Sequence, residues 1–200
     1  MFLNQIIIRE EKSRKFLADM RKNSVDRYTV VRANGTARSE LLKNLGLDEK
    51  TMELIVCYAE REKTNALKEL AINKYHFETE HSGVYFSTDL NYKKGDKMEA
   101  VAIHVIVDRG LADDVIDIAE KAGASGATVL HGRGSGIEKR VAIFDMVIEP
   151  EKDIILLVTS LEQKDKVIDA INKGLDIDST SKGVIFTMPV TDAVGFNFNR

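Results

Sequence analysis

The sequence predicts an α+β protein in which one order of elements, β-α-β-β-α-β, is written twice. The first observation is an echo, because the segment Gly83-Val84-Tyr85-Phe86 recurs as Gly183-Val184-Ile185-Phe186. The second is that two further segments match in the same order at an offset of about 100 residues. These are Ile6–Arg9 with Val105–Arg109, and Tyr28–Arg32 with Ala127–His131. Several matches in one order indicate a duplication.

The second half of the chain shows this order most clearly. Val101–Val107 is a β-branched apolar run of strand length, and Leu111–Ala122 carries apolar residues at helical spacing. Gly123 and Gly126 then end the helix, and a strand begins at Ala127. The remaining elements expected here are a strand at Val141–Ile148, a turn at Glu149–Asp153, a strand at Ile154–Val158, a helix at about Glu162–Lys173 and a strand at Gly183–Thr187.

The first half repeats the order with different residues. Its expected elements are strand Gln5–Arg9, helix Lys12–Lys22, strand Tyr28–Ala33, a short helix Ser39–Leu47, strand Glu53–Tyr58, helix Lys63–Asn73 and strand Val84–Ser87. The order β-α-β-β-α-β is that of the ferredoxin-like fold, whose two crossovers interlock into one antiparallel sheet with both helices on one face. The sequence therefore predicts two tandem ferredoxin-like repeats. We place them at residues 1–94 and 98–200, on either side of a polar linker around Asn91–Lys97.

Composition and charge argue against several classes of protein. Hydrophobic residues make up 44% and charged residues 30% of the 200 residues, as in an ordinary globular protein. A net charge of -3 without a block of basic residues argues against nucleic acid as a partner. No apolar segment approaches the roughly 20 residues needed to span a bilayer. The single cysteine, Cys57, lies in an apolar run and is expected to be a buried thiol. One cysteine cannot form an intrachain disulfide, which fits a reducing compartment. We therefore expect a cytoplasmic protein with no membrane insertion.

The segment whose residues most clearly suggest ligand binding runs from the second strand of the second repeat. There Gly126-Ala127-Thr128-Val129-Leu130-His131-Gly132-Arg133-Gly134-Ser135-Gly136 runs from a strand into alternating glycines. Glycines allow backbone N–H groups to approach an anion closely, so such a loop can hold a phosphate. The spacing fits neither a Rossmann fingerprint nor a Walker loop. A flexible hairpin tip explains the glycines equally well.

This segment resembles the PII nitrogen-regulatory family and its PII-like relatives. Gly126–Val129 and Gly132–Gly134 look like the family's glycine-rich loop base, and Lys182–Phe186 looks like the segment that closes its nucleotide pocket. The resemblance covers most of the second repeat. It implies a sensor that binds an adenine nucleotide (ATP, ADP or AMP) as a regulatory ligand, without a catalytic function. The ligand-binding candidates are Thr128, His131, Gly132, Arg133, Gly134, Thr180, Lys182 and Gly183, with Lys182 facing the phosphate.

The resemblance also implies partners. A PII-like protein forms a homo-oligomer and regulates a transporter or an enzyme according to the ligand it senses. The first repeat has diverged, because Ser82-Gly83 stands where the second repeat has Lys182-Gly183. Two alternatives remain open on the sequence: a ferredoxin-like module that senses an amino acid, and a metal-tolerance type of protein.

The histidines and the C-terminal phenylalanines carry weaker signals. His76 and His81 show no metal-ligand spacing that favours a site, and His104 lies in an apolar strand as a core histidine would. No catalytic Ser-His-Asp or Cys-His arrangement can be assembled from spacing, and we predict that the protein is not an enzyme. Phe196 and Phe198 are expected to pack on a neighbouring repeat or chain.

Overall fold

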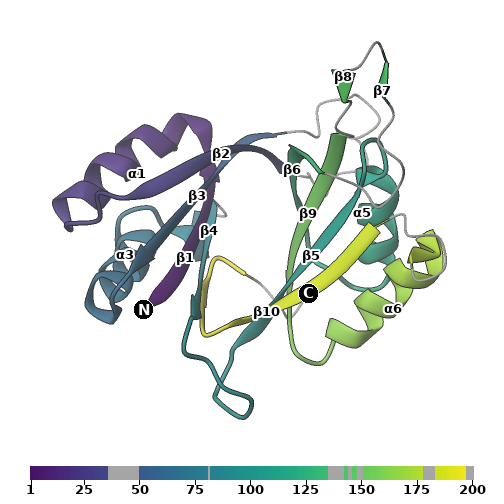
Figure 1. Ribbon diagram of the computed structural model, residues 1–200. Helices are drawn as coiled ribbons and strands as arrows, with labels where there is room; N and C mark the ends of the chain where they lie inside the picture. The colour runs from purple at the N-terminus through teal and green to yellow at the C-terminus, as the bar shows by residue number, and fades with distance from the viewer. Residues whose placement is uncertain are drawn as a thin grey trace.

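A computed structural model describes residues 1–35, 50–80, 82–134, 142–143, 146–147, 151–177 and 183–196. The first repeat contains β1 (Phe2–Arg9), α1 (Glu10–Lys22), β2 (Tyr28–Gly35), β3 (Lys50–Ala59), α3 (Arg61–Asn73), α4 (Phe77–Glu80) and β4 (Gly83–Asp89). The second contains β5 (Ala100–Asp108), α5 (Ala112–Lys121), β6 (Thr128–Arg133), β7 (Ala142–Ile143), β8 (Met146–Val147), β9 (Glu151–Thr159), α6 (Lys164–Leu175) and β10 (Gly183–Val190), followed by β11 (Asp192–Val194). The predicted α+β class with two antiparallel ferredoxin-like units is confirmed (Figure 1).

Register shows that the two repeats are equivalent strand by strand. Gly83 of β4 pairs with Ile8 of β1, and Gly183 of β10 pairs with Val107 of β5. A Cβ atom added at Gly83 would lie 2.8 Å from the carbonyl oxygen of Ile7, and one at Gly183 would lie 2.6 Å from that of Ile106. The two glycines therefore occupy matching positions, as expected for a duplication, and at both a Cβ would crowd a backbone carbonyl. At Gly83 the Cβ would also lie 2.6 Å from the Phe77 ring.

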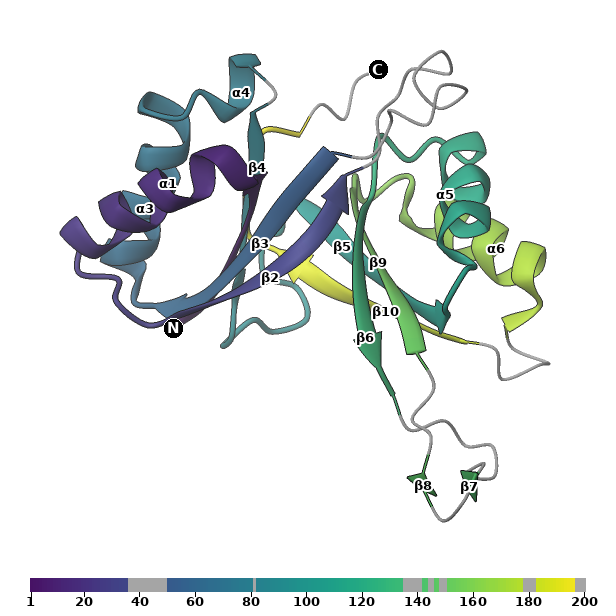
Figure 2. The ribbon, with the colours of Figure 1, turned by 90° about the horizontal axis from the view of Figure 1, so that it is seen from above.

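Two helical layers enclose the strands of the two repeats. In Figure 2, α1, α3 and α4 lie outside the first repeat's strands, and α5 and α6 lie outside those of the second. Each repeat has its own core between helices and sheet, around Phe16 and Leu67 in the first and around Ile103 and Val167 in the second. A third cluster, which includes Phe86 and Leu156, is built by strands of both repeats. We call the side of each sheet toward this shared core the inner face, and the other side the helix face.

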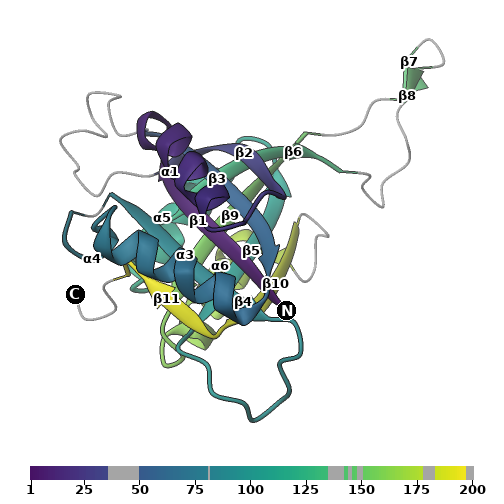
Figure 3. The same cartoon turned by 90° about the vertical axis from the view of Figure 1, so that its left-hand side faces the viewer.

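The strands form one sheet that closes on itself. Its order is β10-β5-β9-β6-β2-β3-β1-β4-β11, and Thr191 alone separates β10 from β11. The repeats join at one end through Ala33–Gly35 of β2, which pair antiparallel with β6. At the other end the chain leaves β5 and pairs with β4. The result is a barrel-like sheet filled by the shared core, with the small β7–β8 pair projecting from the body (Figure 3).

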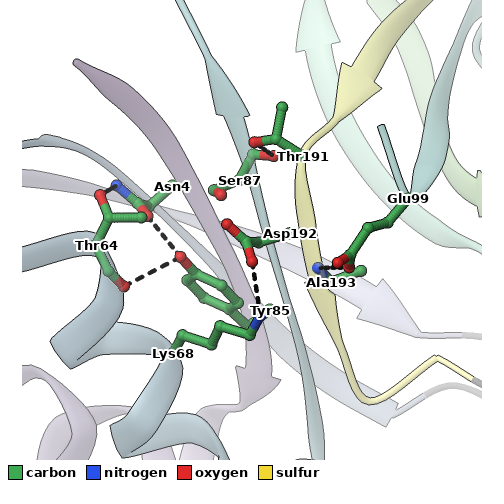
Figure 4. A network of polar contacts seen from close by, with 9 residues as sticks. All are labelled: Asn4, Thr64, Lys68, Tyr85, Ser87, Glu99, Thr191, Asp192 and Ala193. Carbon is green, nitrogen blue, oxygen red and sulfur yellow. Dashed lines mark hydrogen bonds and ion pairs between the residues drawn. The ribbon is translucent and has the colours of Figure 1, made fainter. Parts of the chain in front are cut away.

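Polar contacts hold the closing strand on the first repeat (Figure 4). Lys68 Nζ of α3 lies 2.6 Å from Asp192 Oδ1, and both side chains are largely buried. The backbone N–H of Thr191 donates to the Ser87 carbonyl at 2.8 Å, and that of Ala193 donates to Glu99 Oε2 at 3.2 Å. Beyond these contacts the Phe196 ring packs edge-on against Phe86 with centroids 6.1 Å apart, which confirms the expected packing of Phe196 on the other repeat; Phe198 lies outside the described residues.

Several smaller expectations are tested by the fold. Cys57 is 1% exposed, and burial raises its pKa to about 12, so the predicted buried thiol is confirmed. Strand β9 begins at Glu151, so the predicted turn at Glu149–Asp153 was placed too far along the chain. The helix expected at Ser39–Leu47 lies outside the described residues. Among the residues that are described, no helix is both long and apolar enough to cross a membrane.

A buried carboxylate links α1 to the residues that follow α3 in the first repeat. Asp19 of α1 accepts hydrogen bonds from Lys74 Nζ at 2.6 Å and from Tyr75 Oη at 2.9 Å. The Lys74 hydrogen bond is the main cause that lowers the Asp19 pKa from 3.8 to about 2. Because this pKa is lower in the folded than in the unfolded chain, the ionised carboxylate stabilises the fold above about pH 4, and this contribution is lost as the pH falls toward 2.

Asp19→Asn should therefore lower the free energy of unfolding at neutral pH by about 1–2 kcal/mol, a figure kept small because Lys74 is partly exposed. The difference from the wild type should shrink as the pH falls from about 4 to 2. Urea unfolding at several pH values measures it. The exposed Asp169 of α6 gives a control, Asp169→Asn, and a difference that stayed constant across this pH range would contradict the role assigned to Asp19.

Steric restriction at the paired glycines gives a second prediction. In Gly83→Ala and Gly183→Ala the new methyl group meets a backbone carbonyl, which cannot move without disturbing the sheet. Each variant should lose about 1–3 kcal/mol of stability, the range typical of overpacking. Thermal unfolding checks this, with Gly132→Ala as the control, since its Cβ would meet Ile154 Cδ1 at an ordinary 3.5 Å. If Gly83→Ala and Gly183→Ala were as stable as Gly132→Ala, the steric restriction assigned to the two glycines would be contradicted.

Candidate functional site

The candidate residues of β6 divide between the two faces of the sheet. Successive side chains of a strand point to opposite faces, so Thr128 and Gly132 belong to one face and His131 and Arg133 to the other. Thr128 pairs with Leu156, which is part of the shared core, and this places Thr128 on the inner face. His131 pairs with Asp153 on the helix face. The glycine-rich end of β6 can thus present groups to two surfaces at once.

On the inner face, the glycine-rich end lies beside a lysine. A Cβ added at Gly134 would lie 3.4 Å from Lys152 Cγ, and one at Gly132 would lie 3.5 Å from Ile154 Cδ1. Lys152 Nζ forms an ion pair with Asp108, and the lysine side chain is mostly buried. This corner of the sheet therefore combines small residues with one cation next to the place where the glycine-rich loop begins.

Neither glycine at the end of β6 is needed by the fold. Gly132 and Gly134 do not adopt a positive φ angle, and at neither position would a Cβ atom crowd the backbone. Gly183 differs, because packing against the Ile106 carbonyl explains it without any ligand. For Gly132 and Gly134, close approach of another molecule therefore explains the choice of glycine better than packing within the fold does.

On the helix face, His131 belongs to a hydrogen-bonded pair. Its Nδ1 lies 2.8 Å from Asp153 Oδ1, while Asp153 Oδ2 accepts the backbone N–H of Gly110 at 2.8 Å. Asp153 is 2% exposed, whereas the His131 side chain is 44% exposed. The buried carboxylate thus fixes the orientation of the imidazole and leaves its other nitrogen available as a donor or acceptor.

The His131–Asp153 pair borders a cavity at the seam between the repeats. Its volume is about 210 Å³, and the first repeat contributes Asn34 and Gly35 at the end of β2. The other lining residues are Arg109, Gly110, Ala112, Asp113, Ile116, Val129, His131 and Asp153. Arg109 Nη1 lies 2.7 Å from Glu151 Oε2, and both of these side chains are about half exposed, so Arg109 could exchange this partner for a ligand.

The remaining candidates lie apart from β6 or outside the described residues. Gly183 pairs with Val107, Val107 with Asp153 and Asp153 with His131, so three strand spacings, about 14 Å, separate Gly183 from His131. The sequence grouped these residues into one site, but within a single chain the sheet does not bring them into contact. Thr180 and Lys182 lie outside the described residues.

The first repeat carries different chemistry at the matching positions. There Gly83, Ile8, Glu53 and Arg32 form the same cross-strand row, so Arg32 and Glu53 stand where the second repeat has His131 and Asp153. Arg32 Nη2 lies 3.9 Å from Glu10 Oε1 at the start of α1. Divergence of the first repeat therefore extends from the Ser82-Gly83 segment to the end of β2.

The sequence did not single out Lys152, Asp153 or Arg109. Lys152 and Asp153 were assigned to a turn, although an alternating pattern from Glu151 onward could have extended the strand to include them. His104, expected to be a satisfied core histidine, is only partly buried, and its Nδ1 has no hydrogen-bond partner among the described residues. Burial lowers the His104 pKa to about 4. In the described part of the chain, no three His, Cys, Asp or Glu side chains are placed to hold a metal ion.

Comparisons with solved structures return PII proteins. A Bacillus subtilis GlnK in complex with ATP has 15% identity and a TM-score of 0.37, covering 48% of this chain and 96% of that one. An Arabidopsis thaliana PII bound to citrate has 25% identity and a TM-score of 0.37, covering 48% of this chain and 80% of that one.

Sequence comparisons match the second repeat. The family model described as nitrogen regulatory protein P-II matches residues 100–197. A Methanosarcina barkeri protein named nitrogen fixation nifHD1 region GlnB-like protein 1 is 32% identical over 92 residues, which are 46% of this chain and 88% of that protein. At this identity, and over almost the whole length of the relative, the chain belongs to the nitrogen regulatory protein P-II family.

Proposed function

We propose that this P-II family protein senses an adenine nucleotide through its second repeat and regulates a transporter or an enzyme as a non-catalytic, cytoplasmic signalling protein. The proposed boundaries of the two repeats are residues 1–94 and 98–200, and the family model covers almost all of the second repeat. One observation carries the proposal: Gly132 and Gly134 are glycines that the fold does not require, at the loop base that the family uses for its nucleotide.

The proposed contacts come from both sides of the glycine-rich end of β6. Gly132 and Gly134 would present backbone N–H groups to the phosphates, and Lys152 lies beside Gly134 as a cation of the same face. Thr128, His131 and Arg133 complete the set carried by β6. Thr180, Lys182 and Gly183 are proposed to close the pocket, with Lys182 facing the phosphates. Because Gly183 lies about 14 Å from His131 within one sheet, a second chain is proposed to bring the two groups together.

A second candidate ligand is a free amino acid, for which the seam cavity provides the favouring observation. Arg109 and Asp113 give this cavity charges of both signs, as an amino acid's carboxylate and ammonium groups would require. A volume of about 210 Å³ suits a small ligand of this kind better than a nucleotide.

Thermal unfolding in the presence of ATP, ADP, AMP, the common amino acids and divalent metal salts tests the proposal. A ligand at 100 times its dissociation constant should stabilise the protein by about 2.7 kcal/mol. We expect stabilisation by at least one adenine nucleotide, with guanosine triphosphate as the control for non-specific phosphate binding. Stabilisation by amino acids alone would favour the seam cavity, and no effect of any adenine nucleotide at millimolar concentration would refute the proposed function.

Gly134→Ala separates binding from folding. Its methyl group would meet Lys152 Cγ at 3.4 Å, a contact that a flexible side chain can relieve, so thermal stability should stay within about 1 kcal/mol of the wild type. Nucleotide affinity should fall roughly ten- to a hundredfold, because the methyl group keeps phosphate oxygens from the backbone N–H groups. Titration calorimetry measures this, and Asp169→Asn, at an exposed position of α6, serves as the control for a substitution elsewhere in the chain. Unchanged affinity in Gly134→Ala would remove this glycine from the site.

A further inference from the structure

The seam cavity is built by both repeats. Asn34 and Gly35 at the end of β2 line it from the first repeat, while Arg109 just before α5 and Asp113 in its first turn line it from the second. Strand pairing fixes the position of the first pair, since Asn34 stands opposite Val129 of β6 where the two strands meet (Figure 2). A ligand in this cavity would therefore contact both repeats at once.

The loop that carries Arg109 is held against the start of β9. The backbone N–H of Arg109 donates to the Glu151 carbonyl at 3.2 Å, and that of Gly110 donates to Asp153 Oδ2 at 2.8 Å. Gly110 has a φ angle of 95°, which residues with a side chain rarely adopt, and a Cβ atom there would meet no atom within 4 Å. The loop is thus positioned before a ligand binds and leaves space above Gly110.

Groups of both charge signs lie beside this loop. Arg109 is paired with Glu151, but both side chains are more than half exposed, so a ligand carboxylate could replace Glu151 with little loss of free energy. The first backbone N–H groups of a helix have no partner within the helix, and at the start of α5 they favour an anion as well. Asp113, in the same turn, provides a negative charge. This arrangement suits a small molecule that carries both a carboxylate and an ammonium group.

The rest of the lining is largely apolar. Ile116 is 2% exposed and Val129 is 6% exposed, and both belong to the core of the second repeat. Ala112 lies beside them at the start of α5. An apolar side chain placed here would extend that core, whereas a charged one would lose its water next to these residues. A volume of about 210 Å³ restricts the ligand to a small molecule.

The matching place in the first repeat carries different groups. Glu10 lies two residues after Ile8, as Arg109 lies two residues after the matching Val107, so a carboxylate stands where the second repeat has a cation. The cavity beside Glu10, of about 370 Å³, is lined by Arg9, Glu10, Glu11 and Thr51, none of which is apolar. The combination of a cation, an anion and an apolar lining therefore distinguishes the seam cavity from its counterpart.

We propose that the seam cavity binds a free α-amino acid with a small apolar side chain. The ligand's carboxylate would meet Arg109 and the start of α5, its ammonium group would meet Asp113, and its side chain would lie on Ile116 and Val129. Such a site narrows the second candidate ligand named above to one class of amino acid. Arg109 and Asp113 are not among the proposed nucleotide contacts, so binding here can be measured without a nucleotide.

Titration calorimetry of the full chain with single amino acids tests the site. We expect L-alanine, L-valine or L-leucine to bind, and L-glutamate, L-lysine and L-glutamine to bind at least about tenfold more weakly. Isovalerate and isobutylamine, which each lack one charged group of valine, should also bind at least about tenfold more weakly than valine. No binding of an apolar amino acid at about 10 mM, or equal binding of valine and isovalerate, would overturn the proposal.

Two variants test the contacts. Arg109→Gln and Asp113→Asn should each lower the affinity for the tightest-binding amino acid by about tenfold or more, because each removes the charged partner of one ligand group. Asp114→Asn is the matched control, since Asp114 is an exposed carboxylate of the same first turn that does not line the cavity. Thermal unfolding verifies that each variant is folded. Unchanged affinity in Arg109→Gln, or an equal loss in Asp113→Asn and Asp114→Asn, would overturn the site.

A separate titration of the wild type with ATP distinguishes this site from the proposed function. Binding of ATP without binding of any amino acid would overturn the seam site and leave the nucleotide site in place. Binding of an apolar amino acid without binding of an adenine nucleotide would support the seam site and refute the proposed function.

Discussion

Closure of the sheet by one continuous strand is the constraint on which the rest of the structure depends. Between Gly183 and Val194 the chain pairs first with β5 and then with β4, so the sheet begins and ends on the same segment. The inner faces of the two repeats must then face each other and share a core. Each repeat consequently leaves only its helix face, its loops and a few strand ends for contact with other molecules.

Within that frame the two repeats have taken different roles. The first accepts the closing strand, and the Lys68–Asp192 ion pair fixes it there. The second keeps the glycine-rich end of β6 and the oriented His131–Asp153 pair. The two repeats of a duplicated chain can differ in this way because the shared core buries the inner faces of both repeats together. One copy is then free to provide support while the other retains the loop on which ligand binding would depend.

The sequence predicted local structure well and the arrangement of the repeats poorly, for a physical reason. Hydrophobic periodicity and the repeated Gly-Val-x-Phe segment reflect contacts within one unit, and the predicted element order is confirmed except at Val141–Ile148. The single strand predicted there was wrong, because its described residues form the short strands β7 and β8, which pair with each other. The pairing of β2 with β6 and the course of β11 depend on residues far apart in the chain, and no local pattern encodes them. For the candidate site, the glycine pattern pointed to the end of β6, whose binding role stays a prediction. Lys152 and Asp153 were not singled out, because a proline-containing acidic segment resembles a turn.

Hydrogen exchange of the full chain with and without saturating ATP tests most directly the claim that the second repeat holds the nucleotide. The backbone N–H groups of Gly132 and Gly134 should gain protection on binding, since they are the groups proposed to face the phosphates. The matching segment of the first repeat, Tyr28–Gly35, should exchange at the same rate in both conditions. Protection confined to the first repeat, or exchange at Thr128–Gly134 that saturating ATP leaves unchanged, would contradict the account.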